Sequence, residues 1–246
     1  MSDAIPEHRT AASPMRFDRH LAGAVPGYAN GGVVAGSLAD ALGVVGDGAI
    51  EVRLHRPVPL DRDLSVERDG SGLTVLQDAE PVAAVHVVDA SHAVRGPVSL
   101  AAAQTSRPVI PVERHPAPGC FACGPANGCG LNLQPGAVDG HDLVATAWEP
   151  PTALADASGH LPAAIVWAAL DCPSWYGAAK GAPALLGTIT ARQHRPVPAA
   201  TPLVVSGWGV RRDGRKTLAG SAIHSVDGEP LAVASAIWIH PKEHDR

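Results

Sequence analysis

The strongest candidate for chemistry in this sequence is a carboxylate inside an apolar run. Asp171 directly follows residues 165–170, which are all hydrophobic. A carboxylate in such a run is rarely buried unless it has a partner or a function. Burial would raise its pKa toward the range of a general base at neutral pH. Asp171 is therefore the candidate catalytic base, although it could instead cap or hydrogen bond to the following residues 172–174.

Groups that could stabilise negative charge lie at the start of an earlier apolar run. Asn30, Gly31 and Gly32 open that run, and backbone N–H groups at a helix start can stabilise an oxyanion. The same residues could form only a tight turn. Asp40, late in this run, is the equivalent candidate for a second site, or else an exposed or capping residue. His160, before the second apolar run, could orient a ligand or lie in a surface loop.

Three of the four cysteines lie within ten residues. Cys120, Cys123 and Cys129, with His115, could form a zinc site. The alternative is a tight glycine- and proline-rich loop whose reduced thiols pack on the sheet. A single CxxC without a second pair is a weak metal signal, so we expect no metal and no cofactor. No histidine is placed by the sequence as a partner for a nucleophilic cysteine.

The composition describes a globular chain with a large core. Of 246 residues, 46% are hydrophobic and 17% are charged, and the formal net charge is -5. That charge argues against nucleic-acid binding through a basic face. No apolar stretch reaches the ~18 residues of a membrane span. Residues 1–14 lack an apolar signal-peptide core, so we expect a loose leader on a cytoplasmic protein without a membrane partner.

An internal repeat organises the chain. The pentapeptide HRPVP occurs at 55–59 and again at 194–198. An offset of 139 residues is too long for a solenoid and suits a duplicated domain. An alternating stretch precedes each copy, and an Asp-Gly hairpin signal follows each, at 69–70 and 213–214. His55, His194 and the prolines after them are expected to fix turns.

Each half is predicted to be one helix followed by four antiparallel strands. The helices are expected near 31–45 and 161–176, and both are apolar nearly all round, which predicts burial. A curved sheet wrapped around such a helix would cover its apolar surface. The fold class is therefore α+β. The predicted parts are the leader 1–14, an N-terminal unit 15–95, a linker 96–133 with the cysteines, and a C-terminal unit 134–246.

Short motifs in both halves, taken in order, match a known pattern. They are Asn30-Gly31-Gly32, WAALD at 167–171, GTIT at 187–190 leading into HRP at 194–196, and VAS at 233–235. With them, the chain resembles the double-hotdog acyl-CoA thioesterase II family. The segment CFACGPANGCGL at 120–131 looks like the CFxCGPxNPxGL segment before many single hotdog thioesterase domains. The resemblance implies two fused hotdog units, each with a central helix wrapped by an antiparallel sheet.

The resemblance also implies a catalytic set of an Asp, a Thr and a Gln that together hold a hydrolytic water. Asp171 matches the Asp. Thr188 is the nearest match to the Thr, and Thr190 competes because the following segment is shorter here. Trp238 occupies the position of the Gln, which implies altered chemistry or none. The residues expected around the substrate are Asn30, Gly31, Gly32, Asp40, His160, Trp167 and Trp238.

Three functions fit these patterns. The first is hydrolysis of an acyl-CoA or acyl-carrier thioester with Asp171 as base, assisted by Thr188 or Thr190. The second is a non-catalytic or repurposed hotdog that binds an acyl or CoA ligand, which the Trp238 departure favours. The third is an enoyl-CoA-type hydratase; Asp156 to His160 is the only nearby pair for it, and its spacing differs from that motif. The partner is then a thioester substrate, and further assembly into a homo-oligomer is possible.

Overall fold

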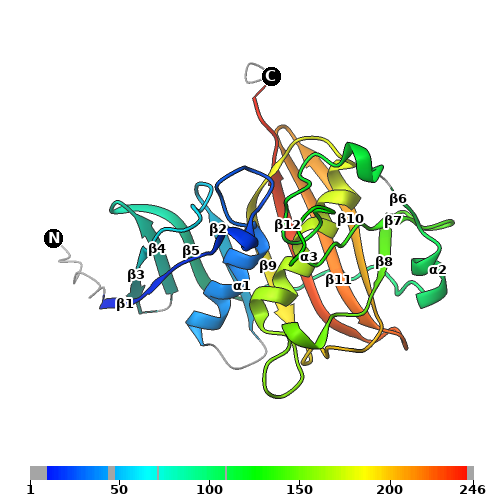
Figure 1. Ribbon diagram of the computed structural model, residues 1–246, viewed down its shortest axis with the longest axis horizontal. Coiled ribbons are helices and arrows are strands. Elements are labelled where there is room, and N and C mark those ends of the chain that lie inside the picture. Colours follow the sequence, from blue (N-terminus) through cyan, green and yellow to red (C-terminus); the bar gives the residue numbers. More distant parts are fainter. Residues whose placement is uncertain (1–9, 44–47, 71, 109, 243–246) are drawn as a thin grey trace.

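The protein is built on one continuous antiparallel sheet with its two long helices on the same face (Figure 1). The computed structural model describes residues 10–43, 48–70, 72–108 and 110–242. The sheet has twelve strands in the order β1-β3-β4-β5-β2-β9-β12-β11-β10-β8-β7-β6. Among the described residues, no helix is long and apolar enough to cross a membrane.

The predicted order of one helix and four strands is present in each half. Alternating side chains and Asp-Gly turns give the strands, while Ala- and Leu-rich apolar runs give the helices. The first half contains α1 (Gly31–Leu42), β2 (Ala49–Leu54), β3 (Leu64–Asp69), β4 (Gly72–Gln77) and β5 (Glu80–Val88). The second contains α3 (Ala163–Ala179), β9 (Leu185–Gln193), β10 (Leu203–Asp213), β11 (Lys216–Ser225) and β12 (Pro230–Ile239).

Shorter elements complete the chain between and around these two sets. A further strand before α3 is β8 (Val144–Trp148). The remaining elements are β1 (Thr10–Met15), β6 (Arg107–Pro108), β7 (Gly136–Ala137), α2 (Leu100–Gln104) and the 3-10 turns η1 (Arg19–Leu21), η2 (Val112–Arg114) and η3 (Thr152–Leu154).

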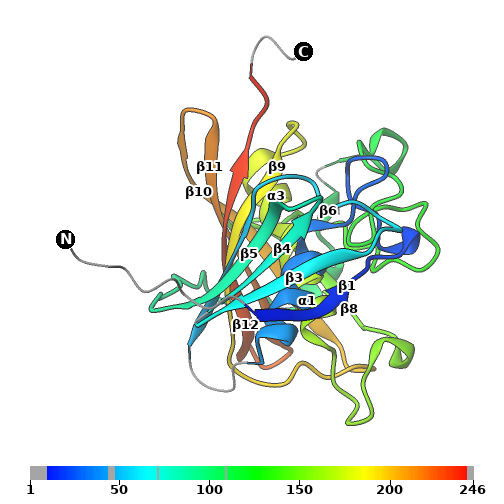
Figure 2. The same cartoon turned by 90° about the vertical axis from the view of Figure 1, so that its left-hand side faces the viewer.

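The predicted loose leader is too long. Residues 10–14 belong to β1, which pairs antiparallel with β3 at the edge of the sheet (Figure 2). Thr10 is opposite Arg68, and the register shifts between Ala12 and Met15. Five of the six residues of β1 are exposed. Because no buried face requires apolar side chains at alternate positions, the sequence of β1 lacks the apolar–polar alternation by which a strand is recognised. The rest of the predicted leader, 1–9, lies outside the described residues.

The two HRPVP segments make the same backbone contacts. The N–H groups of His55 and Arg56 both donate to the carbonyl of Val82, and those of His194 and Arg195 both donate to that of Leu231. The side chain of each arginine pairs with an acidic residue at the start of the last strand of its half, Glu80 as the first residue of β5 or Glu229 just before β12. These segments form the turns after β2 and β9, as predicted.

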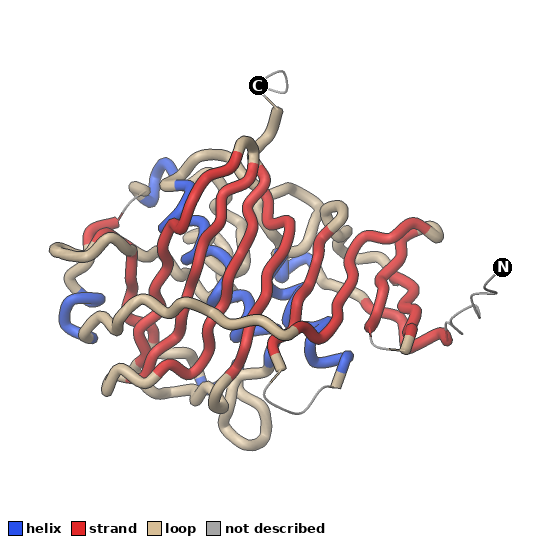
Figure 3. Tube along the Cα trace, turned by 180° about the vertical axis from the view of Figure 1, so that it is seen from behind, coloured by secondary structure: helices blue, strands red, loops and turns tan. Residues whose placement is uncertain are grey.

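The halves are joined in two ways. Strands β2 and β9 pair antiparallel from Ile50 opposite Ala191 to Arg53 opposite Thr188. On the other face, the chain that leaves β5 runs across the outer surface of the C-terminal strands (Figure 3). There His92 Nδ1 lies 3.1 Å from Ser235 Oγ. This connection is therefore packed against the sheet, and Val98 at the start of the predicted linker is buried among strand residues.

On the helix side of the sheet, α1 and α3 cross in close contact. A Cβ placed on Gly36 would lie 2.3 Å from the carbonyl oxygen of Ala163 and 2.6 Å from the Cα of Ala164. One placed on Gly32 would lie 2.6 Å from the Cβ of Asp171 and 2.6 Å from the carbonyl oxygen of Trp167. Backbone therefore packs on backbone at this crossing, and only glycine fits at these two positions.

We expect the substitution Gly36→Ala to destabilise the protein. Alanine is favoured over glycine inside a helix by up to about 1 kcal/mol, but here its methyl group would push the helices apart. Overpacking of this kind costs about 1–3 kcal/mol, so the free energy of unfolding, measured by urea denaturation, should fall despite the better helix former.

The matched control is Gly96→Ala, because a methyl group at Gly96 would meet nothing within 4 Å. This variant should unfold like the wild type. If Gly36→Ala were as stable as Gly96→Ala, the close helix crossing described above would be wrong.

Candidate active site

Asp171 lies on α3 where that helix faces the start of α1. Its Oδ2 accepts hydrogen bonds from the backbone N–H of Gly32 and from Nδ2 of Asn30, both at 2.9 Å. The Oδ1 of Asn30 in turn accepts from the N–H of Val33 at 2.9 Å and caps α1. Asn30 therefore fixes the helix start and holds the carboxylate with the same side chain.

The environment of Asp171 raises its pKa from the ordinary value to about 7. Burial is the main cause, and the charge on Cys120 adds to it. The hydrogen bonds from Gly32 and Asn30 act in the opposite direction. The residue is 2% exposed, and its second oxygen, Oδ1, is buried without a hydrogen-bond partner among the described residues. A buried acceptor of this kind is costly unless it serves a function or holds a further ligand.

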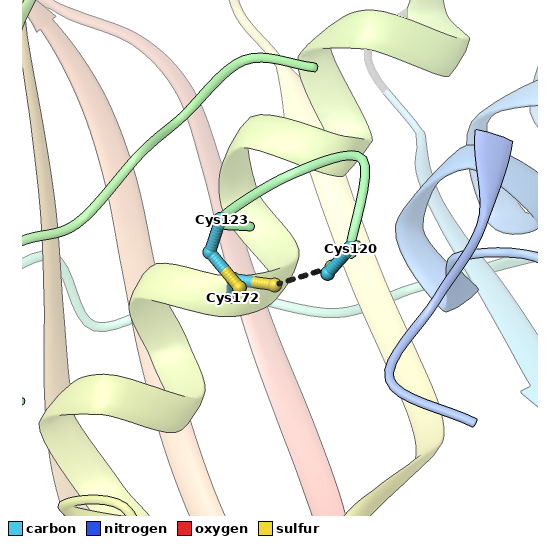
Figure 4. A group of neighbouring side chains, drawn as sticks. All are labelled: Cys120, Cys123 and Cys172. Atoms are coloured by element: carbon cyan, nitrogen blue, oxygen red, sulfur yellow. Dashed lines mark hydrogen bonds between the residues drawn. The ribbon is translucent and has the colours of Figure 1, made fainter. Parts of the chain in front are cut away.

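Three cysteine sulfurs gather beside this carboxylate (Figure 4). Cys120 and Cys123 come from the linker loop and Cys172 from α3, and the three Sγ atoms lie within 4.8 Å of one another. The Sγ atoms of Cys120 and Cys172 are 3.8 Å apart. Nδ2 of Asn30 reaches Cys120 as well, at 3.7 Å from its Sγ. The linker loop therefore covers the start of α1 and the carboxylate.

The three thiols differ in their pKa values. The pKa of Cys120 is held well below its ordinary value, because the thiols of Cys123 and Cys172 and the backbone N–H groups of Cys123 and Ala122 all hydrogen bond to its sulfur. The pKa values of Cys123 and Cys172 are raised, since each donates to Cys120. Cys120 is therefore the thiol most readily ionised in the cluster.

A second polar pair extends the buried network along α3. The hydroxyl of Tyr176 lies 2.7 Å from Nε2 of His115. Nδ1 of the same histidine accepts from the backbone N–H of Ala117 at 3.1 Å, so Nε2 carries the proton and donates to the tyrosine oxygen. Burial raises the pKa of Tyr176 and lowers that of His115. His115 therefore anchors the loop that carries Cys120.

Asp40 occupies the place on α1 that Asp171 occupies on α3, but its role differs. The backbone N–H groups of Ala163 and Ala164, at the start of α3, hydrogen bond to its carboxylate. Helix α3 begins after Pro162, which has no capping side chain of its own. Partial burial raises the pKa of Asp40, and the two N–H groups oppose that shift. Asp40 therefore caps the neighbouring helix from a partly exposed position.

Thr188 and Thr190 are not brought to Asp171. Oγ1 of Thr190 donates to Glu51 at 3.3 Å, on the outer face of the sheet. Ile189 lies between the threonines and is fully buried in the main core with the helices. Because side chains alternate along a strand, both threonines point away from α3.

Trp238 does face α3. Its Nε1 donates to Oγ of Ser174 at 2.8 Å, and that hydroxyl donates to the carbonyl oxygen of Asp171 at 2.7 Å. The indole therefore fills the space at the expected Gln position and braces the turn of helix that carries Asp171. Residues 172–174 continue α3 and include Pro173 within the helix, so Asp171 does not cap a loop there.

The other predicted positions divide between core and loop. Trp167 is buried on α3, with its carbonyl oxygen against Gly32. Gly31 packs between the side chains of Leu54 and Leu186. His160 hydrogen bonds to Ser158 in the loop before α3, more than two helical turns from Asp171 along the chain. Cys129 is exposed and stands apart from the other three cysteines.

Sequence reasoning missed Cys172 and Tyr176. Cys172 lies 52 residues beyond Cys120, so no short motif connects it to the CxxC. One signal was available: Cys172 is adjacent to the candidate base Asp171, and a loop that covered Asp171 would also cover Cys172.

Solved structures share this architecture. A conserved protein of Alicyclobacillus acidocaldarius with a hotdog fold superposes with a TM-score of 0.61 at 14% identity, covering 97% of this chain and 95% of that one. A TesB protein of Mycobacterium avium subspecies paratuberculosis gives 0.59 at 13% identity, covering 98% and 95%. An acyl-CoA thioesterase II of Mycobacterium marinum gives 0.54 at 13%, covering 88% and 90%. The chain has a hotdog fold. No protein-family model matches the sequence, and a comparison with curated proteins finds no match either.

We expect Asn30→Asp to destabilise the protein strongly. The aspartate could still accept from Val33, but it would set a second carboxylate against Asp171 and remove the donor to Oδ2. Leaving a buried polar group without its hydrogen bond costs about 1–3 kcal/mol, and more when the group is charged, so the loss should appear in urea denaturation.

The control is the exchanged pair, Asn30→Asp with Asp171→Asn. The new asparagine can donate to the new aspartate, so part of the lost stability should return, as a double-mutant cycle measures. Equal stability of Asn30→Asp and the wild type would show that the carboxylate and the amide do not interact.

Proposed function

We propose that this chain hydrolyses an acyl thioester, of CoA or of an acyl carrier, with Asp171 as the general base. The observation that carries the proposal is the state of its carboxylate. Oδ2 is fixed by Gly32 and Asn30, while the buried Oδ1 has no partner among the described residues. A fixed carboxylate with one free oxygen can orient a water molecule and take its proton. We further propose that the two halves are fused hotdog units with one active site between them.

The start of α1 is the proposed place for the thioester carbonyl. The peptide dipoles at a helix N-terminus stabilise a developing oxyanion. The water held at Oδ1 would attack the carbonyl carbon, and the thiolate would leave. Thr188 and Thr190 are not part of this proposal, because both face away from α3.

Access to Asp171 depends on the linker loop. Cys120, at 3.7 Å from Asn30, lies over the carboxylate, and the N–H of Phe121 ties the loop to the carbonyl of Ala22. For an acyl chain to reach Asp171, the loop 115–133 has to move, as lids do in many enzymes. Loop opening is therefore proposed as part of substrate binding.

The alternative function is binding of an acyl or CoA ligand without turnover. Trp238 supports it, because an indole hydrogen-bonded to Ser174 cannot position a water as a glutamine amide would. A non-hydrolysable thioether analogue of the substrate separates the two functions. Under the alternative, the analogue raises the melting temperature of the protein while the matching thioester is not consumed.

The test is thiol release from short, medium, long and aromatic acyl-CoAs. We expect turnover of at least one substrate by the wild type. Asp171→Asn should lower kcat at least ~100-fold, the usual effect of losing a general base, while the amide keeps the size of the side chain.

Asp40→Asn is the matched control, because Asp40 holds the equivalent place on α1 and caps α3. Its turnover should stay close to that of the wild type. Wild-type turnover that survives Asp171→Asn would move the chemistry to another residue. A complete absence of turnover, with binding of the thioether analogue, would support the alternative.

A further inference from the structure

The cysteine cluster has the composition of a metal site. Cys120 and Cys123 form a C-x-x-C in the linker loop, and Cys172 approaches from α3. All three are buried, whereas Cys129 is exposed and lies outside the group. Soft thiolate ligands select zinc, copper(I) and iron–sulfur clusters. The ligand set differs from the one the sequence suggested, since Cys172 takes the place of Cys129 and His115 binds Tyr176.

The spacing of the sulfurs matches tetrahedral zinc. With Zn–S bonds near 2.3 Å and tetrahedral angles, two sulfurs on one zinc ion lie ~3.8 Å apart. The Sγ atoms of Cys120 and Cys172 are 3.8 Å apart, and the three sulfurs all lie within 4.8 Å of one another. The three sulfurs therefore lie close to the separations that one tetrahedral zinc ion requires.

The loop supplies the surroundings that a thiolate ligand needs. Nδ2 of Asn30 donates to the sulfur of Cys120 at 3.7 Å. Gly124 closes the turn with an N–H bond to the carbonyl of Cys120 at 2.8 Å. A Cβ on Gly124 would lie 2.4 Å from the nitrogen of Cys120, so the tight turn requires glycine. Such outer hydrogen bonds orient metal ligands.

The carboxylate of Asp171 lies beside the three sulfurs, although it is not part of the group whose ligand atoms are all within 4.8 Å of one another. This residue is adjacent to Cys172, and Asn30 contacts both its carboxylate and the sulfur of Cys120. Its Oδ1 is the buried oxygen without a partner among the described residues. A water molecule bound to a cation at the three sulfurs would satisfy this oxygen. The orphaned oxygen is an observation independent of the sulfur geometry, and it points to the same ligand.

We propose that Cys120, Cys123 and Cys172 bind one zinc ion, with the fourth position directed at the carboxylate of Asp171 through a water molecule. The ion ties the linker loop to α3. It is bound as the chain folds, because the ligands come from segments far apart in the sequence and do not form a site in the unfolded chain. This site shares the carboxylate of Asp171 and the linker loop with the proposed hydrolysis, so the loop would have to open with zinc bound. The two proposals can still be tested separately, because zinc binding can be measured whether or not a thioester is cleaved.

The first experiment is elemental analysis of the full chain, purified under reducing conditions without chelator. We expect about one zinc ion per chain, the stoichiometry of a single tetrahedral site. Replacement of zinc by cobalt(II) should give the intense visible bands of tetrahedral cobalt and a sulfur-to-cobalt charge-transfer band. This spectrum needs only the wild-type protein, so a variant that fails to fold does not prevent the test.

Cysteine variants assign the ligands. Cys120→Ser and Cys172→Ser should each weaken zinc binding at least ~100-fold in competition with a chromogenic chelator, more than a typical loss of an outer hydrogen bond. Cys129→Ser is the matched control and should bind zinc like the wild type. Zinc retained equally in all three variants would overturn the assignment. So would a reduced wild-type protein that takes up neither zinc nor cobalt, or a disulfide between Cys120 and Cys172 in the protein as purified.

The variant Asp171→Asn separates this site from the proposed function. Three thiolates remain in it, so it should keep zinc while it loses thioester hydrolysis. Loss of hydrolysis with zinc retained supports both proposals. Zinc bound to a chain that hydrolyses no thioester would leave the metal site standing and reject only the hydrolase.

Discussion

The close crossing of α1 and α3 is the constraint on which the rest of the structure depends. Two helices approach to backbone contact only where side chains are missing, and Gly32 and Gly36 provide those places. At this distance the start of each helix comes within hydrogen-bonding range of a carboxylate on the other. Asp171 accepts from the N–H of Gly32, and Asp40 accepts from those of Ala163 and Ala164. The packing of the helices and the position of the carboxylates therefore have one cause.

Burying Asp171 at this crossing requires compensation. Removing a charged carboxylate from water is costly unless hydrogen bonds or an opposite charge replace the solvent. Two N–H donors serve Oδ2, but the nearest ionisable groups are thiols, and the charge on Cys120 repels the carboxylate. Burial and this charge together raise the pKa of Asp171 to about 7. The carboxylate can therefore exchange a proton near neutral pH, which is the basis of its proposed role as a general base.

Much of the fold could be predicted from sequence because it is encoded locally. The HRPVP repeat, the alternating strands and the two apolar helices each leave a signal in consecutive residues, and the helix and strand order followed from them. The strand β1 left no such signal, since most of its residues are exposed. Asp171 was identified because a charge within an apolar run is visible without a structure.

The partners of Asp171 could not be predicted in the same way. Cys172 joins Cys120 only through the path of the linker, and pairing Glu51 with Thr190 required the register between β2 and β9. A shift of one residue in that register would have placed the threonines on the other face. The side of a strand that faces a site is a property of the assembled sheet, and short motifs do not carry it.

The unequal use of Asp40 and Asp171 has a consequence for how such a protein can evolve. In a symmetric dimer of identical chains, every substitution appears at both copies of an interface. Both carboxylates would then be buried away from solvent, or both would cap a helix. A single chain that carries both helices is free of this coupling. One aspartate can stabilise the neighbouring helix while the other becomes buried among thiols. Covalent linkage of the two helices therefore permits specialisation that symmetry forbids.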